Sequence, residues 1–246
     1  MKRALVVQHS YPEFLGSIEK QLENRGIGFS YVRPFTGQAL PASALQYDAL
    51  WLLGGAWPVN DHEHLPWLDD ELRLIRAFER ARRPVVGFGF GALLLALAWG
   101  GTPSGDSPRA YWTKARAGNT PDAVAEVAAG SDVLVIANGE VQLPPTVMPL
   151  LVDAEGRWIA ARKGNAYALL LRPELRPGML EDMVMEDGYP LPDAFGAVLE
   201  QARAEWPRTQ LVTDRLIAAL IATLDLMRER RKPPVFTLQP VKSTGP

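Results

Sequence analysis

The fold is indicated most clearly by residues 83–94, which read RPVVGFGFGALL. Val85 to Phe88 has the apolar composition of a short buried strand, and the glycines after it permit a tight turn into a helix. A strand, a tight turn and a helix in this order form a nucleophile elbow, which exposes the side chain at the turn. The residue at this turn is Gly89, which has no side chain to react. The chain therefore has the layout of a catalytic site without a nucleophile at its centre.

The segments on either side of this turn alternate between strands and helices. Apolar runs predict strands at residues 4–8, 29–32, 48–53 and 85–88, and apolar stripes or end signals predict helices at residues 17–24, 67–82 and 91–99. This alternation indicates a flavodoxin-like, doubly wound α/β fold with a mostly parallel sheet. Further strands at residues 109–117, 132–137, 149–153, 157–162 and 166–172 are joined by tight turns, which predicts antiparallel additions to that sheet.

The C-terminal part of the chain has a different character. Two helices are expected after Pro173, at about residues 193–205 and 211–231, followed by a proline-containing tail. We therefore expect one α/β domain over residues 1–175, a helical extension at residues 176–232 that packs on the same domain, and an extended or disordered tail at residues 233–246.

The composition excludes several classes of protein. A formal net charge of −2 argues against a nucleic-acid-binding protein, and 47% apolar residues are ample for a packed core. The chain has no cysteine, so disulfides, thiolate metal sites and thiol catalysis are all excluded. The most apolar long segment, residues 211–227, contains Asp214, Arg215 and Asp225, which argues against a membrane span. The N-terminus lacks a signal-peptide core, so a cytoplasmic protein that binds neither nucleic acid nor membrane is expected.

Several short motifs occur along the chain in a fixed order. They are Tyr47-Asp48 before a strand that ends at Gly54-Gly55, Asp61 before Pro66-Trp67-Leu68, Gly87 and Gly91 around the elbow, Asn138-Gly139-Glu140 before Leu143-Pro144, and finally Arg172-Pro173-Glu174. In their order and spacing these motifs resemble those of class I glutamine amidotransferases, over about residues 3–175. The resemblance is closest to the free-standing subgroup that is similar to the glutaminase part of GMP synthase.

The resemblance implies a degenerate catalytic triad. In that family a Cys at the elbow attacks the side-chain amide of glutamine, and a His two residues before a Glu acts as the base. The matching positions hold Gly89 and Arg172, Leu93 stands where a Gln is expected, and only Glu174 is retained. Gly89 cannot form a thioester, and Arg172 cannot accept a proton near neutral pH because its pKa lies above ~12. Glutaminase chemistry by the Cys–His–Glu route is therefore excluded.

Two interpretations of the remaining site stay open. The backbone N–H groups of Gly55, Ala56 and Phe90, at a helix N-terminus, could converge on an anionic ligand, and Arg172 would add a bidentate donor. Alternatively, Arg172 folds back onto Glu174 and fills the volume left by the missing Cys and His side chains.

Three other features could carry chemistry. His62-Glu63-His64, next to Asp61, has the residue types of a metal site, but two histidines in a proline-punctuated loop are more simply surface residues, and no metal or other cofactor is expected. His9 follows the first strand, where it could line a pocket or cap a loop. Ser10 lies next to it, but no motif places a His to activate it.

The loss of nucleophile, base and Gln favours a pseudoenzyme that acts as a binding, scaffolding or regulatory subunit. Class I amidotransferase domains usually work with a synthase, so the resemblance implies a protein partner of that kind, or a homo-oligomer. The alternative is a glutamine amidotransferase, or a hydrolase of γ-glutamyl or other amides, that uses a non-cysteine mechanism. In that case Glu174, His9 or His62 would activate water beside the surviving oxyanion amides.

Overall fold

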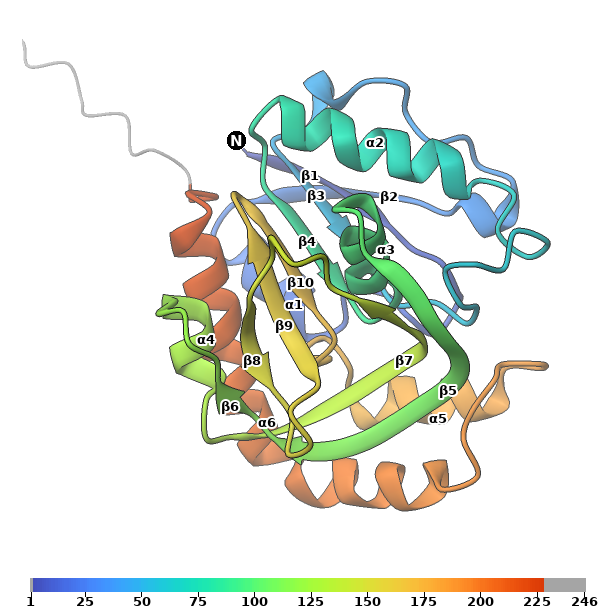
Figure 1. The fold of residues 1–246 in the computed structure, drawn as a ribbon, viewed down its shortest axis with the longest axis vertical. Coiled ribbons are helices and arrows are strands. Elements are labelled where there is room, and N and C mark those ends of the chain that lie inside the picture. Colours follow the sequence, from blue (N-terminus) through green and yellow to red (C-terminus); the bar gives the residue numbers. More distant parts are fainter. Residues whose placement is uncertain (1, 228–246) are drawn as a thin grey trace, which may run out of the picture.

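An eight-stranded sheet lies at the centre of the molecule (Figure 1). The structure is a computed structural model that describes residues 2–227. The strands follow the order β2 (Gly28–Val32), β1 (Arg3–Val7), β3 (Ala49–Leu52), β4 (Val85–Phe88), β10 (Ala166–Leu169), β9 (Trp158–Lys163), β8 (Pro149–Val152) and β6 (Arg116–Ala117). The first five strands are parallel, and β9, β8 and β6 are antiparallel additions. The predicted fold class is confirmed.

Helices cover both faces of this sheet, as doubly wound folds require (Figure 1). On one side α2 (Leu68–Arg80) packs against α3 (Phe90–Ala98), and on the other side α1 (Ser17–Glu23) packs against α6 (Phe195–Thr223). Two further helices, α4 (Ala123–Ala128) and α5 (Pro177–Met185), also pack against α6. Two short 3₁₀ turns at Pro34–Thr36 and Ala44–Gln46 lie between β2 and β3. No helix among the described residues has the length and apolar character of a membrane span.

Two long strands form a second, separate sheet. β5 (Thr102–Lys114) pairs antiparallel with β7 (Asp132–Gln142), and the register shifts on both sides of Gly105. The expectation that residues 109–117 and 132–137 join the main sheet is therefore wrong for these strands, since only Arg116–Ala117 does so, through β8. The physical reason is that β-bulges bend a two-stranded ribbon away from a flat sheet.

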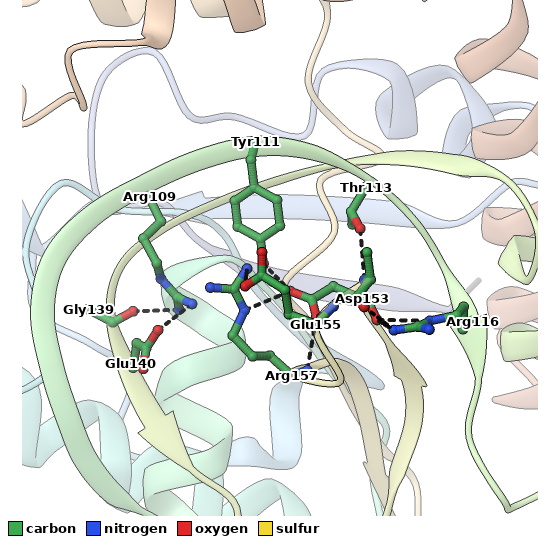
Figure 2. A network of polar contacts seen from close by, with 10 residues as sticks. Arg109, Tyr111, Thr113, Arg116, Gly139, Glu140, Asp153, Glu155 and Arg157 are labelled. Carbon is green, nitrogen blue, oxygen red and sulfur yellow. Dashed lines mark hydrogen bonds and ion pairs between the residues drawn. The ribbon is translucent and has the colours of Figure 1, made fainter.

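A polar network fastens this ribbon to the turn between β8 and β9 (Figure 2). Asp153 is buried in that turn, and one of its oxygens accepts hydrogen bonds from the backbone N–H groups of Glu155 and Arg157 at 2.9 Å. Its other oxygen accepts a hydrogen bond from the Tyr111 hydroxyl of β5 at 2.9 Å, and the Asp153 carbonyl accepts one from Arg116. The network keeps the ribbon in place beside α3 and the main sheet.

The helices after Pro173 and two earlier elements differ from the expectation. The predicted helices at 193–205 and 211–231 are one continuous helix, α6, which passes through Pro207 and ends at Thr223. The helix is continuous because its apolar face is buried on both sides of Pro207, which outweighs one lost hydrogen bond. The sequence interpretation also missed α5 and α4, although Asp122 caps α4 as an N-cap Asp should. The strand expected at 166–172 ends at Leu169, and the predicted tail at 233–246 lies outside the described residues.

Candidate functional site

The carboxyl ends of the parallel strands bring the predicted site residues to one edge of the sheet. His9 follows β1, Gly55 follows β3, Gly89 follows β4, and Arg172 follows β10. This is the edge at which open α/β sheets bind ligands. The parallel order of β1, β3, β4 and β10 therefore gathers residues that lie far apart in the sequence.

Gly89 forms the turn of the elbow between β4 and α3. Its backbone has φ 52° and ψ −113°, a combination that favours glycine, and its N–H donates a hydrogen bond to the Leu169 carbonyl at 2.9 Å. A side chain at Gly91, at the start of the helix, would overlap the Leu52 carbonyl of β3. The strand, turn and helix predicted from residues 83–94 are all present, and the helix starts in direct contact with the sheet.

The Arg172 side chain is completely buried beneath this elbow. Its Nε donates a hydrogen bond to Glu174 at 2.6 Å, its Nη2 donates to Glu13 at 2.7 Å, and its Nη1 donates to the Ile136 carbonyl of β7 at 3.3 Å. The side chains of Arg172, Glu13 and Glu174 have at most 1% exposure. Arg172 therefore pairs with Glu174, as one of the two interpretations proposed, and it also pairs with a second carboxylate.

Arg172, Glu174 and Glu13 form a buried cluster of charged side chains. Glu13 is the member of this cluster that was not predicted from the sequence. It lies in the loop between β1 and α1, 159 residues before Arg172. One oxygen faces the guanidinium, and the other accepts hydrogen bonds from the Ser10 hydroxyl at 2.7 Å and the Tyr189 hydroxyl at 2.8 Å. No motif marks Glu13 in the sequence, and its role follows only from the three-dimensional arrangement.

The electrostatic surroundings keep the Arg172 guanidinium charged, but they leave the Glu174 carboxyl group with too few partners. Burial opposes ionisation of Arg172, but Glu174 and Glu13 outweigh it, so the pKa of Arg172 lies above its ordinary value. Burial raises the pKa of Glu174, although Arg172 opposes the effect, and one Glu174 oxygen is buried without a hydrogen-bond partner among the described residues. Burial and the neighbouring Glu13 likewise raise the pKa of the Tyr189 hydroxyl.

The cluster occupies the space that a side chain at the elbow would need. A Cβ atom added to Gly89 would lie 2.8 Å from Arg172 Nη1 and 3.0 Å from the Ile136 carbonyl oxygen. A Cβ atom at Gly54 would overlap both Glu13 and Arg172. Glycine at these two positions and the buried guanidinium are therefore mutually dependent.

The three backbone positions expected to bind an anion are also gathered here. Phe90 is 1% exposed, and its ring meets the imidazole of His9 edge-on, with centroids 4.7 Å apart. A Cβ atom added to Gly55 would lie 3.1 Å from the same ring. The Asn138 side-chain amide of β7 donates a hydrogen bond to the Ala56 carbonyl at 2.6 Å, which fixes the loop after β3. Within residues 2–227, no hydrogen bond engages the backbone N–H of Gly55, Ala56 or Phe90.

His9 is held between hydrogen-bond acceptors on both sides of its ring. Its Nε2 lies 2.8 Å from a Glu71 oxygen, and its Nδ1 lies 3.1 Å from the carbonyls of Leu53 and Gly54. Both ring nitrogens must carry a proton to satisfy these acceptors. Burial alone would lower the pKa of His9, but the Glu71 carboxylate outweighs it and raises the pKa. The ring is positioned as a buried cation, and both of its nitrogens face acceptors, so neither is available to take up a proton.

The loop at residues 61–64 shares no hydrogen bond or ion pair with Arg172, Glu13 or Glu174 among the described residues. His64 stacks on Trp57 with ring centroids 3.8 Å apart, and its Nδ1 lies 2.9 Å from an Asp61 oxygen. Among the described residues, no group of three or more His, Cys, Asp or Glu side chains is arranged to hold a metal ion. Leu93, where the resemblance implies a Gln, is buried in α3.

Comparisons with known proteins show what the fold and part of the sequence are similar to. No family model matches the chain. A segment of 103 residues is 36% identical to the glutamine amidotransferase-like protein YfeJ of Salmonella typhimurium, covering 41% of this chain and 43% of YfeJ. The matched part thus spans less than half of the curated relative.

Solved structures share the fold over nearly the whole chain. A glutamine amidotransferase from Methylobacillus flagellatus is 21% identical, with a TM-score of 0.78 over 95% of this chain and 99% of that chain. A Thermoplasma acidophilum protein described as part of a GMP synthase is 16% identical, with a TM-score of 0.56 over 92% of this chain and 97% of that chain. The resemblance to class I glutamine amidotransferases stated from the sequence is confirmed as a likeness of fold and, in part, of sequence.

Removing the guanidinium tests the energetic role of the cluster. We expect Arg172→Met to lower the free energy of unfolding at neutral pH by about 3–5 kcal/mol, because two buried carboxyl groups lose their shared partner. Without Arg172 the pKa of the buried Glu174 rises further above its unfolded value, so the loss is largest at high pH and shrinks as the group becomes protonated. Urea unfolding at pH 5 and pH 8 measures both effects.

The exposed Arg203 of α6 provides the matched control. It pairs with Glu181 and Glu200 on the surface, and Arg203→Met should leave the free energy of unfolding nearly unchanged at both pH values. Equal losses for Arg172→Met and Arg203→Met, or a loss for Arg172→Met that grows toward low pH, would contradict this account of the cluster.

Proposed function

We propose that this chain is a catalytically inactive protein with a class I glutamine amidotransferase fold, acting in the cytoplasm as a binding, scaffolding or regulatory subunit. The observation that carries the proposal is the position of Arg172. Its guanidinium lies within 2.8 Å of where a side chain at Gly89 would begin, and it is fixed there by Glu13 and Glu174. A nucleophile and a proton acceptor are both missing from the place where the elbow would present them.

The alternative is an amidotransferase or amide hydrolase with a non-cysteine mechanism. It needs a general base near the N–H groups of Phe90 and Ala56. Glu174 pairs with Arg172 through one oxygen, and its other oxygen is buried away from solvent. Both nitrogens of His9 face acceptors, so neither side chain is placed to take a proton from bulk water. His62 is exposed in the loop before α2, and no hydrogen bond among the described residues joins its side chain to a site residue. These contacts favour the inactive protein over the alternative.

The subunit role rests on the comparisons and on the retained fold. The Thermoplasma acidophilum protein with this fold is described as one subunit of GMP synthase, which supports a synthase-like protein partner for this chain, or self-association. A small anion at the N–H groups of Gly55, Ala56 and Phe90, next to Arg172, belongs to the same proposal. It would have to compete with Glu13 and Glu174 for the guanidinium.

Ammonia release from glutamine and from γ-glutamyl amides tests the loss of catalysis. We expect no turnover above that of Glu174→Gln, since losing one member of a triad already costs on the order of a thousandfold or more in rate. Gly89→Cys should add no activity, because its Cβ would contact Arg172, whereas Gly89→Cys combined with Arg172→His removes that contact. Turnover by the natural protein that disappears in Glu174→Gln would establish the alternative instead.

The mass of the native particle tests the subunit role. The chain has a mass of 27.1 kDa, and the protein isolated gently from its host should elute in a larger particle with a second component or several copies. Light scattering coupled to size exclusion gives this mass directly. A lone monomer of 27.1 kDa under these conditions would count against the proposal.

A further inference from the structure

A hollow opens at the same edge of the sheet as the elbow, at the carboxyl ends of β1 and β2. It has a volume of about 540 Å³ and lies on the opposite side of β1 from β3 and the elbow. Its lining includes Gln8 after β1, Arg33 after β2, and aromatic residues from both segments. None of the residues discussed for the elbow lines this hollow.

The Arg33 side chain is held in this hollow by a hydrogen bond from Nε and by the face of an aromatic ring. Its Nε donates a hydrogen bond to the Gln8 side chain at 2.9 Å, and its backbone N–H donates one to the Gln38 side chain at 2.8 Å. The guanidinium carbon lies 5.1 Å from the centre of the Tyr31 ring, within cation–π distance. The guanidinium group is therefore fixed before any ligand arrives.

The two terminal nitrogens of Arg33 are open to a ligand. Within residues 2–227, no hydrogen bond and no ion pair engages Nη1 or Nη2, although Arg33 is only partly exposed. Arg172, in contrast, has acceptors on all three of its nitrogens. A partly buried cation without an ion-pair contact among the described residues favours an anion, and a fixed guanidinium matches two oxygens of a carboxylate or phosphate.

Aromatic side chains form the other wall of the hollow. Tyr11 is 63% exposed and meets the Phe35 ring edge-on, with centroids 4.9 Å apart. Such an exposed ring beside a fixed cation provides a surface for the ring of a ligand. The acidic side chain in the lining, Glu19, accepts a hydrogen bond from the Tyr31 hydroxyl at 2.6 Å, and its charge opposes an anion.

We propose that this hollow binds a small aromatic oxyanion. The Arg33 guanidinium would hold its carboxylate or phosphate group through Nη1 and Nη2, and the ligand ring would pack against Tyr11. This site is independent of the function proposed for the elbow, because it uses neither Gly89 nor Arg172. Failure of one proposal leaves the other unaffected.

Calorimetric titration of the full-length protein with phenyl phosphate and with benzoate tests the site. Inorganic phosphate and acetate are the ring-free probes, so the four titrations separate phosphate from carboxylate and aromatic from simple anions. We expect an aromatic probe to bind, and Arg33→Gln to weaken it by about tenfold or more, because a bidentate charge-assisted contact is lost. Glu19→Gln should strengthen binding, since it removes a like charge.

Matched variants separate binding from folding. Tyr11→Ala changes an exposed residue and should weaken the aromatic probe without affecting inorganic phosphate. Arg33→Lys keeps the charge and loses the planar fork, so it should bind more weakly than the natural protein. Arg208→Gln, on the surface of α6, is the control and should bind normally. The proposal is overturned if no probe binds the natural protein, or if Arg33→Gln and Arg33→Lys bind as well as Arg208→Gln.

Discussion

The buried guanidinium of Arg172 is the interaction on which the rest of this edge of the sheet depends. It joins Glu13 from the loop before α1, the Ile136 carbonyl from the β5–β7 ribbon, and Glu174 from the segment after β10. A buried charge is tolerated only when hydrogen bonds and opposite charges compensate it. A shift of any one of these segments would leave the guanidinium without a partner, so the cluster holds all of them in place. The cluster thus organises these parts of the chain around one planar group, and Tyr189, through Glu13, extends it to the loop after α5.

This arrangement accounts for an elbow that keeps its backbone geometry around a residue without a side chain. The turn at Gly89 and the start of α3 keep the backbone geometry in which a nucleophile would be presented. The volume in front of that turn is filled by a permanently protonated group, which acts neither as a nucleophile nor as a proton acceptor. The hollow at Arg33 lies on another surface of the same scaffold. Among the described residues, the terminal nitrogens of its guanidinium have no hydrogen-bond partner.

Local patterns in the sequence were sufficient to predict the parallel sheet and the elbow, and to offer the pairing of Arg172 with Glu174 as one of two interpretations. Each of these rests on neighbouring residues, such as the apolar run before Gly89 or the spacing of two between Arg172 and Glu174. Glu13 could not be predicted, because an acidic residue in a loop has many potential partners and its true partner is 159 residues away. The pairing of β5 with β7 was missed for a related reason, since an alternating pattern identifies a strand but not its neighbour. The continuity of α6 through Pro207 depends on burial along its whole inner face, which outweighs a local signal.

The central claim is that Gly89 and the Arg172 guanidinium share one volume, and a double-mutant cycle measures this coupling directly. Gly89→Ala would be introduced into the natural protein and into the Arg172→Ala variant, and the free energy of unfolding of all four proteins determined in urea. Backbone strain at φ 52° is the same in both backgrounds, whereas the contact at 2.8 Å exists only when Arg172 is present. The account predicts that Gly89→Ala costs less in the Arg172→Ala background, by about 1 kcal/mol or more. An equal cost in both backgrounds would contradict it.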